Sequence, residues 1–203
     1  MGTTVKIEKS GVKEALKKSK DSYEDTVQAL NGANAVMKGL HTYWGGNLYN
    51  EIVTAWNNIY PTINTFLENA KKAYNFMSGA LKVYTTADIQ KIDMGTVKTS
   101  KLTGLETKDS DNLDATTSKL RADGVSTVRH ISTAISQLTI LFNSIVNSPA
   151  SSDAINEAKN YMKANKAIIL NGLQDVSSIV SKNINTAADR FDAAEEAVKN
   201  ATE

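Results

Sequence analysis

Residues 47–87 read NLYNEIVTAWNNIYPTINTFLENAKKAYNFMSGALKVYTTA and contain the most regular pattern in the chain. Apolar or small residues recur at steps that are mostly four and three, which is the spacing of one face of an amphipathic helix. They are Leu48, Ile52, Ala55, Ile59, Ile63, Phe66, Ala70, Ala73, Met77, Ala80, Tyr84 and Ala87. This stripe predicts one long helix that packs against other helices. Pro61 interrupts it and should remove one backbone hydrogen bond, so we expect a bend there.

A second helical pattern precedes this one, over residues 10–43. Its apolar positions are Val12, Leu16, Tyr23, Val27, Leu30, Met37, Leu40 and Tyr43. Only Trp44, Gly45, Gly46 and Asn47 separate the two patterns, and a connection this short joins antiparallel neighbours. Residues 1–90 are therefore predicted to form one helical hairpin.

The second half of the chain repeats this organisation. Residues 91–112 are rich in Thr, Ser, Lys and Asp and lack a stripe, so we interpret them as a linker with room for a short helix. Residues 113–203 predict a second hairpin with its turn at 147–152. Its seams are Leu113, Leu120, Val128, Ile131, Ile135, Leu138, Phe142 and Ile145, then Ile155, Ala158, Met162, Ile169, Val176, Ile179, Ala187, Phe191, Ala194 and Val198. Two antiparallel hairpins predict an all-α four-helix bundle, closed within one chain or between two chains as a homodimer.

The composition excludes several classes of protein. Lys and Arg total 23 against 22 Asp and Glu, a balance that argues against a nucleic-acid binder. The chain has no cysteine, so it has neither disulfides nor thiolate chemistry. Its first twenty residues contain no apolar core of a signal peptide, and no apolar stretch has the length of a stable membrane span. If the protein is exported, we expect a route that needs no cleavable signal peptide.

No catalytic constellation is visible in the sequence. His41 and His130 are the two histidines, and neither has Asp, Glu or Cys neighbours at metal-ligand spacing. Gly45 and Gly46 lack the Lys-Ser/Thr that follows in a phosphate-binding loop. We therefore expect no enzymatic activity, no cofactor and no metal site.

Two short motifs flank the most regular helix. Trp44-Gly45-Gly46 forms W-x-G at the predicted turn, and Tyr84 with Asp88 forms Y-x-x-x-D at the far end of the helix. Together, in an all-helical half, they resemble the WXG superfamily of ESAT-like small secreted proteins, over residues 1–90. The resemblance implies export by a bacterial type VII secretion system and pairing of hairpins as antiparallel four-helix bundles. It also implies that the turn of one hairpin lies near the tail motif of its partner.

The resemblance implies an export and partner-recognition signal made from Trp44, Gly45, Gly46, Tyr84 and Asp88, together with surfaces of the second hairpin. From the residues alone, Trp44 allows two interpretations. Its indole packs in the end of the bundle, or it is exposed and contacts a partner protein.

The second half departs from the family pattern. Its turn lacks W-x-G, and its tail offers only Phe191 and Glu195, a weaker motif with Phe in place of Tyr. This half resembles a degenerate partner fused in tandem, which leaves open which tail motif is read for export.

We therefore expect a secreted substrate, or a co-secreted partner or carrier, that acts through protein–protein contacts. Its partners would be the type VII secretion machinery or a co-secreted effector. Two alternatives stay open: a membrane-active helical protein, suggested by the apolar run LTILFNSIV at 138–146, and a cytosolic chaperone for a larger secreted toxin.

Overall fold

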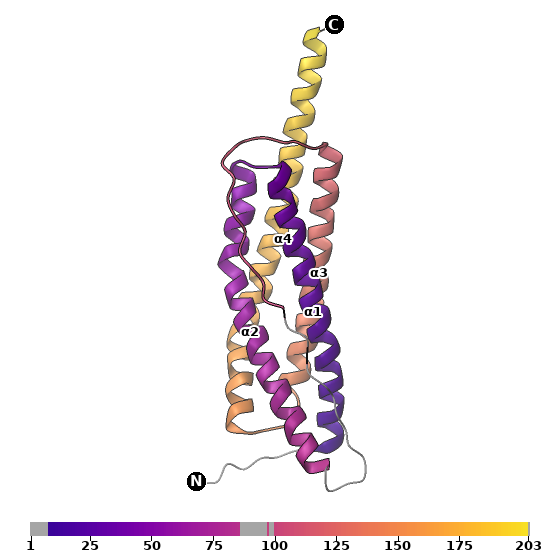
Figure 1. The fold of residues 1–203 in the computed structure, drawn as a ribbon, viewed down its shortest axis with the longest axis vertical. Coiled ribbons are helices and arrows are strands. Elements are labelled where there is room, and N and C mark those ends of the chain that lie inside the picture. Colours follow the sequence, from indigo (N-terminus) through magenta and orange to yellow (C-terminus); the bar gives the residue numbers. More distant parts are fainter. Residues whose placement is uncertain (1–7, 86–96, 98–99, 203) are drawn as a thin grey trace. The chain divides into compact units, whose positions relative to one another are not determined.

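The structure, a computed structural model, describes residues 8–85, 97 and 100–202. This part of the chain forms four helices and no β-strand: α1 (Lys9–Tyr43), α2 (Asn47–Thr85), α3 (Thr117–Val146) and α4 (Asp153–Thr202) (Figure 1). One isolated antiparallel bridge joins Trp44 to Leu113. The predicted all-α four-helix bundle is confirmed.

The helices divide into two compact units, and each unit contains segments of all four. Unit 1 comprises α1 up to Gln28, α2 from Thr62, α3 from Ala134 and α4 up to Leu170. Unit 2 comprises α1 from Ala29, α2 up to Pro61, residues 102–133 and α4 from Asn171. The helix α2 continues through Pro61.

Unit 1 contains the turn between α3 and α4. The helices end at Val146 and begin at Asp153, so the predicted turn at 147–152 is confirmed. Ser152 caps α4, because its Oγ accepts a hydrogen bond of 3.2 Å from the amide of Ile155. The ammonium group of Lys159, which is 8% exposed, donates to the carbonyls of Ser148 and Ala150, both at 2.8 Å. These bonds satisfy backbone groups that the turn would otherwise bury unpaired.

In unit 2, α1 packs closely on α3 and α2 packs closely on α4. A Cβ added to Gly32 of α1 would lie 2.6 Å from Cε1 of His130 on α3. A Cβ added to Gly172 of α4 would lie 2.7 Å from Cδ1 of Ile59 on α2. Glycine therefore allows these helices to approach where a side chain would separate them.

The helix α3 begins later than the predicted apolar stripe, which started at Leu113. Leu113 precedes the helix, which begins at Thr117 and is capped by Thr116, whose Oγ1 accepts a bond of 3.2 Å from the amide of Lys119. Residues 102–112, which we call the strap, are not helical. Leu102 and Leu105 of the strap are nevertheless buried. The strap therefore packs as part of unit 2.

Candidate partner-recognition site

The turn between α1 and α2 is built around a glycine. The amide of Trp44 makes the last helical bond of α1, to the carbonyl of Leu40 at 2.8 Å. Gly46 has a φ of +94°, a conformation that favours glycine. Its carbonyl accepts the first bond of α2, from the amide of Asn50 at 3.0 Å. The chain thus reverses direction over Gly45 and Gly46.

The indole of Trp44 is packed inside unit 2. Trp44 is 1% exposed, and its indole packs edge-on against the ring of Tyr49, with the ring centroids 5.7 Å apart. Of the two interpretations of Trp44, this conformation agrees with the one in which the indole is packed in the bundle. A partner can contact the indole only if the surrounding chain moves.

The strap covers the turn. The amide of Gly45 donates to the carbonyl of Asn112 at 3.2 Å, and the amide of Gly46 donates to that of Lys108 at 2.7 Å. A Cβ on Gly45 would lie 2.5 Å from the carbonyl oxygen of Ser110. The two glycines of the W-x-G motif therefore let the strap pack directly on the backbone of the turn.

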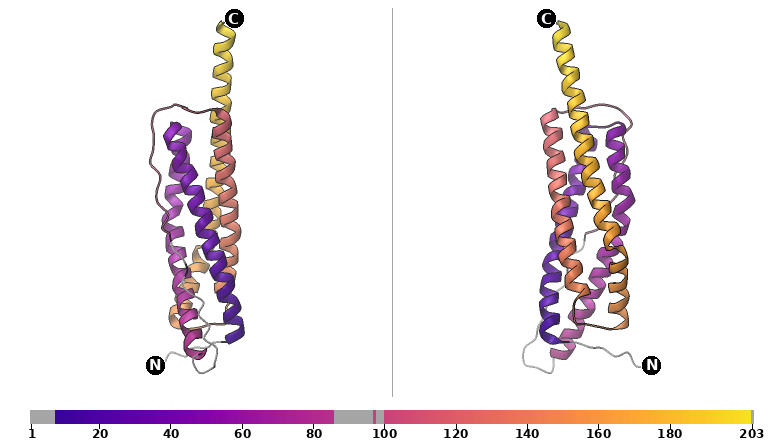
Figure 2. Two further views of the ribbon diagram at one scale, coloured as in Figure 1. Left: turned by 45° about the vertical axis from the view of Figure 1, so that its right-hand side comes forward. Right: turned by 180° about the vertical axis from the view of Figure 1, so that it is seen from behind.

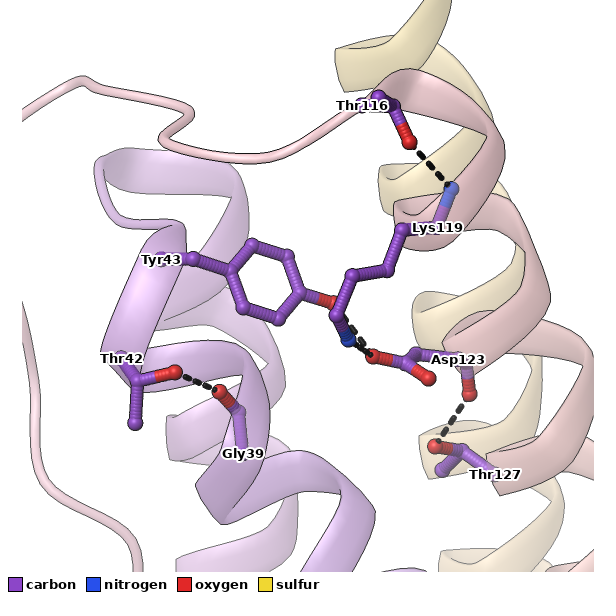
Figure 3. A network of polar contacts seen from close by, with 7 residues as sticks. All are labelled: Gly39, Thr42, Tyr43, Thr116, Lys119, Asp123 and Thr127. Carbon is purple, nitrogen blue, oxygen red and sulfur yellow. Dashed lines mark hydrogen bonds and ion pairs between the residues drawn. The ribbon is translucent and has the colours of Figure 1, made fainter.

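A network on the α3 side fixes the end of α1 (Figure 3). The hydroxyl of Tyr43 donates to Oδ2 of Asp123 at 2.6 Å, and the ammonium group of Lys119 reaches the same oxygen at 2.7 Å. That ammonium group also lies 4.4 Å from the centroid of the Tyr43 ring. Burial opposes ionisation of Asp123, but the hydrogen bonds from Lys119 and Tyr43 outweigh it and lower the pKa of this carboxyl.

Asp123→Asn is expected to lower the free energy of unfolding at pH 7 by about 1–3 kcal/mol, because Tyr43 and Lys119 lose a charged acceptor. The pKa of Asp123 is lower in the folded state, so its contribution is present above its unfolded pKa and is lost as the pH falls through the folded value. Urea unfolding at pH 7 and near pH 3 measures the difference between wild type and variant, which should shrink at the acidic pH. Exposed Asp175 supplies the control variant, Asp175→Asn. An Asp123→Asn effect no larger than the control effect at pH 7 would contradict this account.

Side chains of α4 tie this helix to the same region. Asn183, which is 1% exposed, donates to the carbonyl of Leu48 at 2.9 Å and to Glu51 at 2.7 Å. Asp192 accepts from Arg121 at 2.7 Å and from Thr117 at 2.6 Å. The hydrogen bonds from Thr117 and Arg121 lower the pKa of Asp192. These contacts hold the segment of α4 that contains the second tail motif against α2 and α3.

A cavity of about 300 Å³ lies between the turn, the strap and α4. Apolar side chains and the rim charges Asp109, Asp111 and Arg190 line it together. The lining residues are Trp44, Gly46, Asn47, Leu48, Asp109, Asp111, Ala187, Arg190, Phe191 and Ala194. The structure thus brings the W-x-G turn and Phe191 of the second tail motif to one cavity.

The other predicted site residues lie elsewhere. Glu195 is exposed, one turn beyond Phe191. Tyr84 is the penultimate residue of α2, in the part of this helix that belongs to unit 1. Asp88 lies outside the described residues.

Sequence reasoning missed the strap contacts of Asn57, Asn34 and Trp56. The side chain of Asn57 donates to the carbonyl of Leu105 at 2.9 Å and accepts from its amide at 2.8 Å. The indole N–H of Trp56 and the amide of Asn34 both donate to the carbonyl of Thr103 at 3.0 Å. Asparagines facing a segment some fifty to seventy positions away give no signal in a single sequence.

Comparisons with protein-family models, curated proteins and solved structures gave no match. Among the described residues, no group of three or more His, Cys, Asp or Glu is arranged to hold a metal ion. None of the described helices combines the length and the apolar character needed to cross a membrane.

Proposed function

We propose that this protein is a substrate, or a co-secreted partner or carrier, of a bacterial type VII secretion system. The observation that supports the proposal is the cavity shared by Trp44, Gly46 and Phe191. The resemblance to the WXG superfamily implies a turn of one hairpin beside the tail motif of the other. Here one chain supplies both, because α1–α2 contributes the turn and α4 contributes the tail.

The exposed end of α4 offers a surface that a partner can contact. Residues 192–202 are all exposed, and the helix continues past the first residues of α3 (Figure 2). Phe191 lines the cavity, while Glu195 lies one turn later on the exposed segment. We infer that Glu195 and the rim of the cavity form the accessible part of the signal, and that Phe191 sets the position of the helix.

Export of point variants tests this assignment. In a bacterium with an intact type VII system, we expect Glu195→Gln and Asp88→Asn each to reduce the protein in the culture supernatant severalfold, because each removes a recognised carboxylate. Glu196→Gln is the matched control, since Glu196 is also exposed and adjacent to Glu195. Circular dichroism and immunoblots of cell extracts establish folding and expression.

The outcomes of that comparison separate the two tail motifs. A defect in Glu195→Gln alone assigns the signal to α4, and a defect in Asp88→Asn alone assigns it to the first motif. Normal export of both variants would contradict a recognition role for either carboxylate.

The membrane-active alternative depends on residues 138–146, which lie in α3. Leu138, Leu141 and Ile145 in this run are 2%, 1% and 0% exposed, so they belong to the core of unit 1. Ile140 of the same run is 44% exposed, so the run is divided between the core and the surface of unit 1. Because its leucines are already packed in this conformation, we favour the secretion proposal.

A further inference from the structure

Tyr49 of α2 is fully buried, but its hydroxyl has no hydrogen-bond partner in the described part of the chain. Its ring packs against the rings of Trp44 and His41, with centroids 5.7 and 5.9 Å away. Burial and the nearby Glu106 raise the pKa of Tyr49 to about 12, so at pH 7 the hydroxyl is neutral and can donate a hydrogen bond. Buried groups without a partner are rare in folded proteins, because they destabilise the fold.

The same tyrosine lines a cavity of about 300 Å³ between α1, α2 and the strap. The other lining residues are Lys38 and His41 of α1 and Gly104, Leu105 and Glu106 of the strap. Lys38 and Glu106 are exposed, so we infer that the mouth of the cavity lies between these two side chains. A volume of this size is at the lower end of the range for sites that bind small molecules.

Hydrogen bonds hold the strap against α1 at this cavity. The ammonium group of Lys38 donates to Oγ1 of Thr103 at 2.6 Å, and the ammonium group of Lys108 donates to the carbonyl of His41 at 3.1 Å. Both bonds join α1 to the strap. The walls of the cavity are therefore in place before a ligand enters, which reduces the cost of ordering the site when a ligand binds.

Two walls of the cavity carry opposite charges. Lys38 is on the α1 wall, with the imidazole of His41 one turn later, and the carboxylate of Glu106 is on the strap wall. Leu105 and the ring of Tyr49 add apolar lining. A ligand that matches this lining carries an anionic group and a cationic group and has a small apolar part.

We propose that this cavity binds a free amino acid with a small aliphatic side chain, while the strap stays in place. The carboxylate of the ligand lies toward Lys38 and accepts a hydrogen bond from the hydroxyl of Tyr49. Its ammonium group lies toward Glu106, and its aliphatic part packs against Leu105. The ligand thus supplies the partner that the buried hydroxyl lacks. The proposal concerns the folded protein alone and does not depend on export.

Chemical-shift titration of the isotope-labelled, full-length protein with three probes tests the charge pattern. Valine carries both charged groups, isobutylamine lacks the carboxylate, and isovalerate lacks the ammonium group. We expect valine to shift the amide signals of residues 104–106 with a Kd of about 1 mM or below. Each analogue should bind at least about tenfold more weakly, because it leaves one charged wall without a partner. Equal affinity for the three probes, or no binding of valine at tens of millimolar, would overturn the proposal.

Tyr49→Phe separates a role in binding from a role in folding, because it removes the hydroxyl and keeps the ring. We expect the Tm of the free protein to rise by about 2 °C or more, since a buried group without a partner is gone. The affinity for valine should fall by about fivefold, since the ligand loses one hydrogen bond. Unchanged affinity for valine, or a Tm at or below that of the wild type, would contradict a hydroxyl that pairs with the ligand.

Variants of the two charged walls assign the ends of the ligand. Lys38→Gln should abolish the preference for valine over isobutylamine, and Glu106→Gln should abolish the preference for valine over isovalerate. Lys17→Gln is the matched control, because Lys17 is an exposed lysine of α1 in unit 1. Both preferences intact in the wall variants, or lost equally in the control, would overturn the assignment. None of these readouts involves a secretion system, so failure of export would overturn the proposed function and leave this result standing.

Discussion

Trp44→Ala is expected to lower the free energy of unfolding by about 3–5 kcal/mol, the usual cost of truncating a large buried aromatic side chain. Trp44 is 1% exposed, packs edge-on against Tyr49 and pairs with Leu113 through its backbone. Removing the indole enlarges the cavity where the turn, the strap and α4 meet. Urea unfolding followed by circular dichroism measures the loss.

Trp44→Phe is the control for this prediction. It keeps an aromatic ring against Tyr49 and should cost less than half as much as the alanine variant. An export defect of Trp44→Ala would therefore report mainly on folding, whereas a defect of a stable Trp44→Phe would report on recognition. A loss below about 1 kcal/mol for Trp44→Ala would contradict the packing described for unit 2.

Gly46→Ala is expected to have the second largest effect, a loss of roughly 2–4 kcal/mol. The φ of +94° costs a residue with a Cβ on the order of 1–3 kcal/mol. The added Cβ would also lie 2.6 Å from Oδ1 of Asp111 in the strap, so the strap must shift. Thermal unfolding and the fluorescence of the two tryptophans report the loss of stability and the displacement of the strap.

Gly39→Ala is the matched control, because a Cβ added to this helical glycine would meet no atom within 4 Å apart from its own stretch of helix backbone. It should be neutral or stabilising by up to about 1 kcal/mol through helix propensity. Equal effects of Gly46→Ala and Gly39→Ala would contradict the role of the turn conformation and of the strap contact.

The helices could be predicted from the sequence because their cores repeat with a short period. Most of the predicted stripe between Ile52 and Met77 is buried on α2. The helices end at the predicted breaks, 44–46 and 147–152. The strap could not be predicted, because its polar composition resembles that of a solvated linker. Its binding depends on asparagines and an indole that lie far away in the chain.

The candidate site was predicted only in part. The proximity of the W-x-G turn to the tail of α4 was implied by a family resemblance, and in the structure Trp44 and Phe191 line one cavity. The sequence alone could not decide whether Trp44 is buried or exposed, because its burial depends on Leu113, Tyr49 and the strap. The recognition roles of Tyr84 and Asp88 stay predictions.

The amount of wild-type protein in culture supernatants is a direct measure of export by a type VII secretion system. The full-length chain would be expressed in a bacterium with an intact type VII system and in an isogenic strain lacking that system, with a cytosolic protein as the lysis marker. We expect the protein to accumulate in the supernatant of the first strain and to stay in the cells of the second. Retention in both strains, or equal release from both, would contradict this expectation.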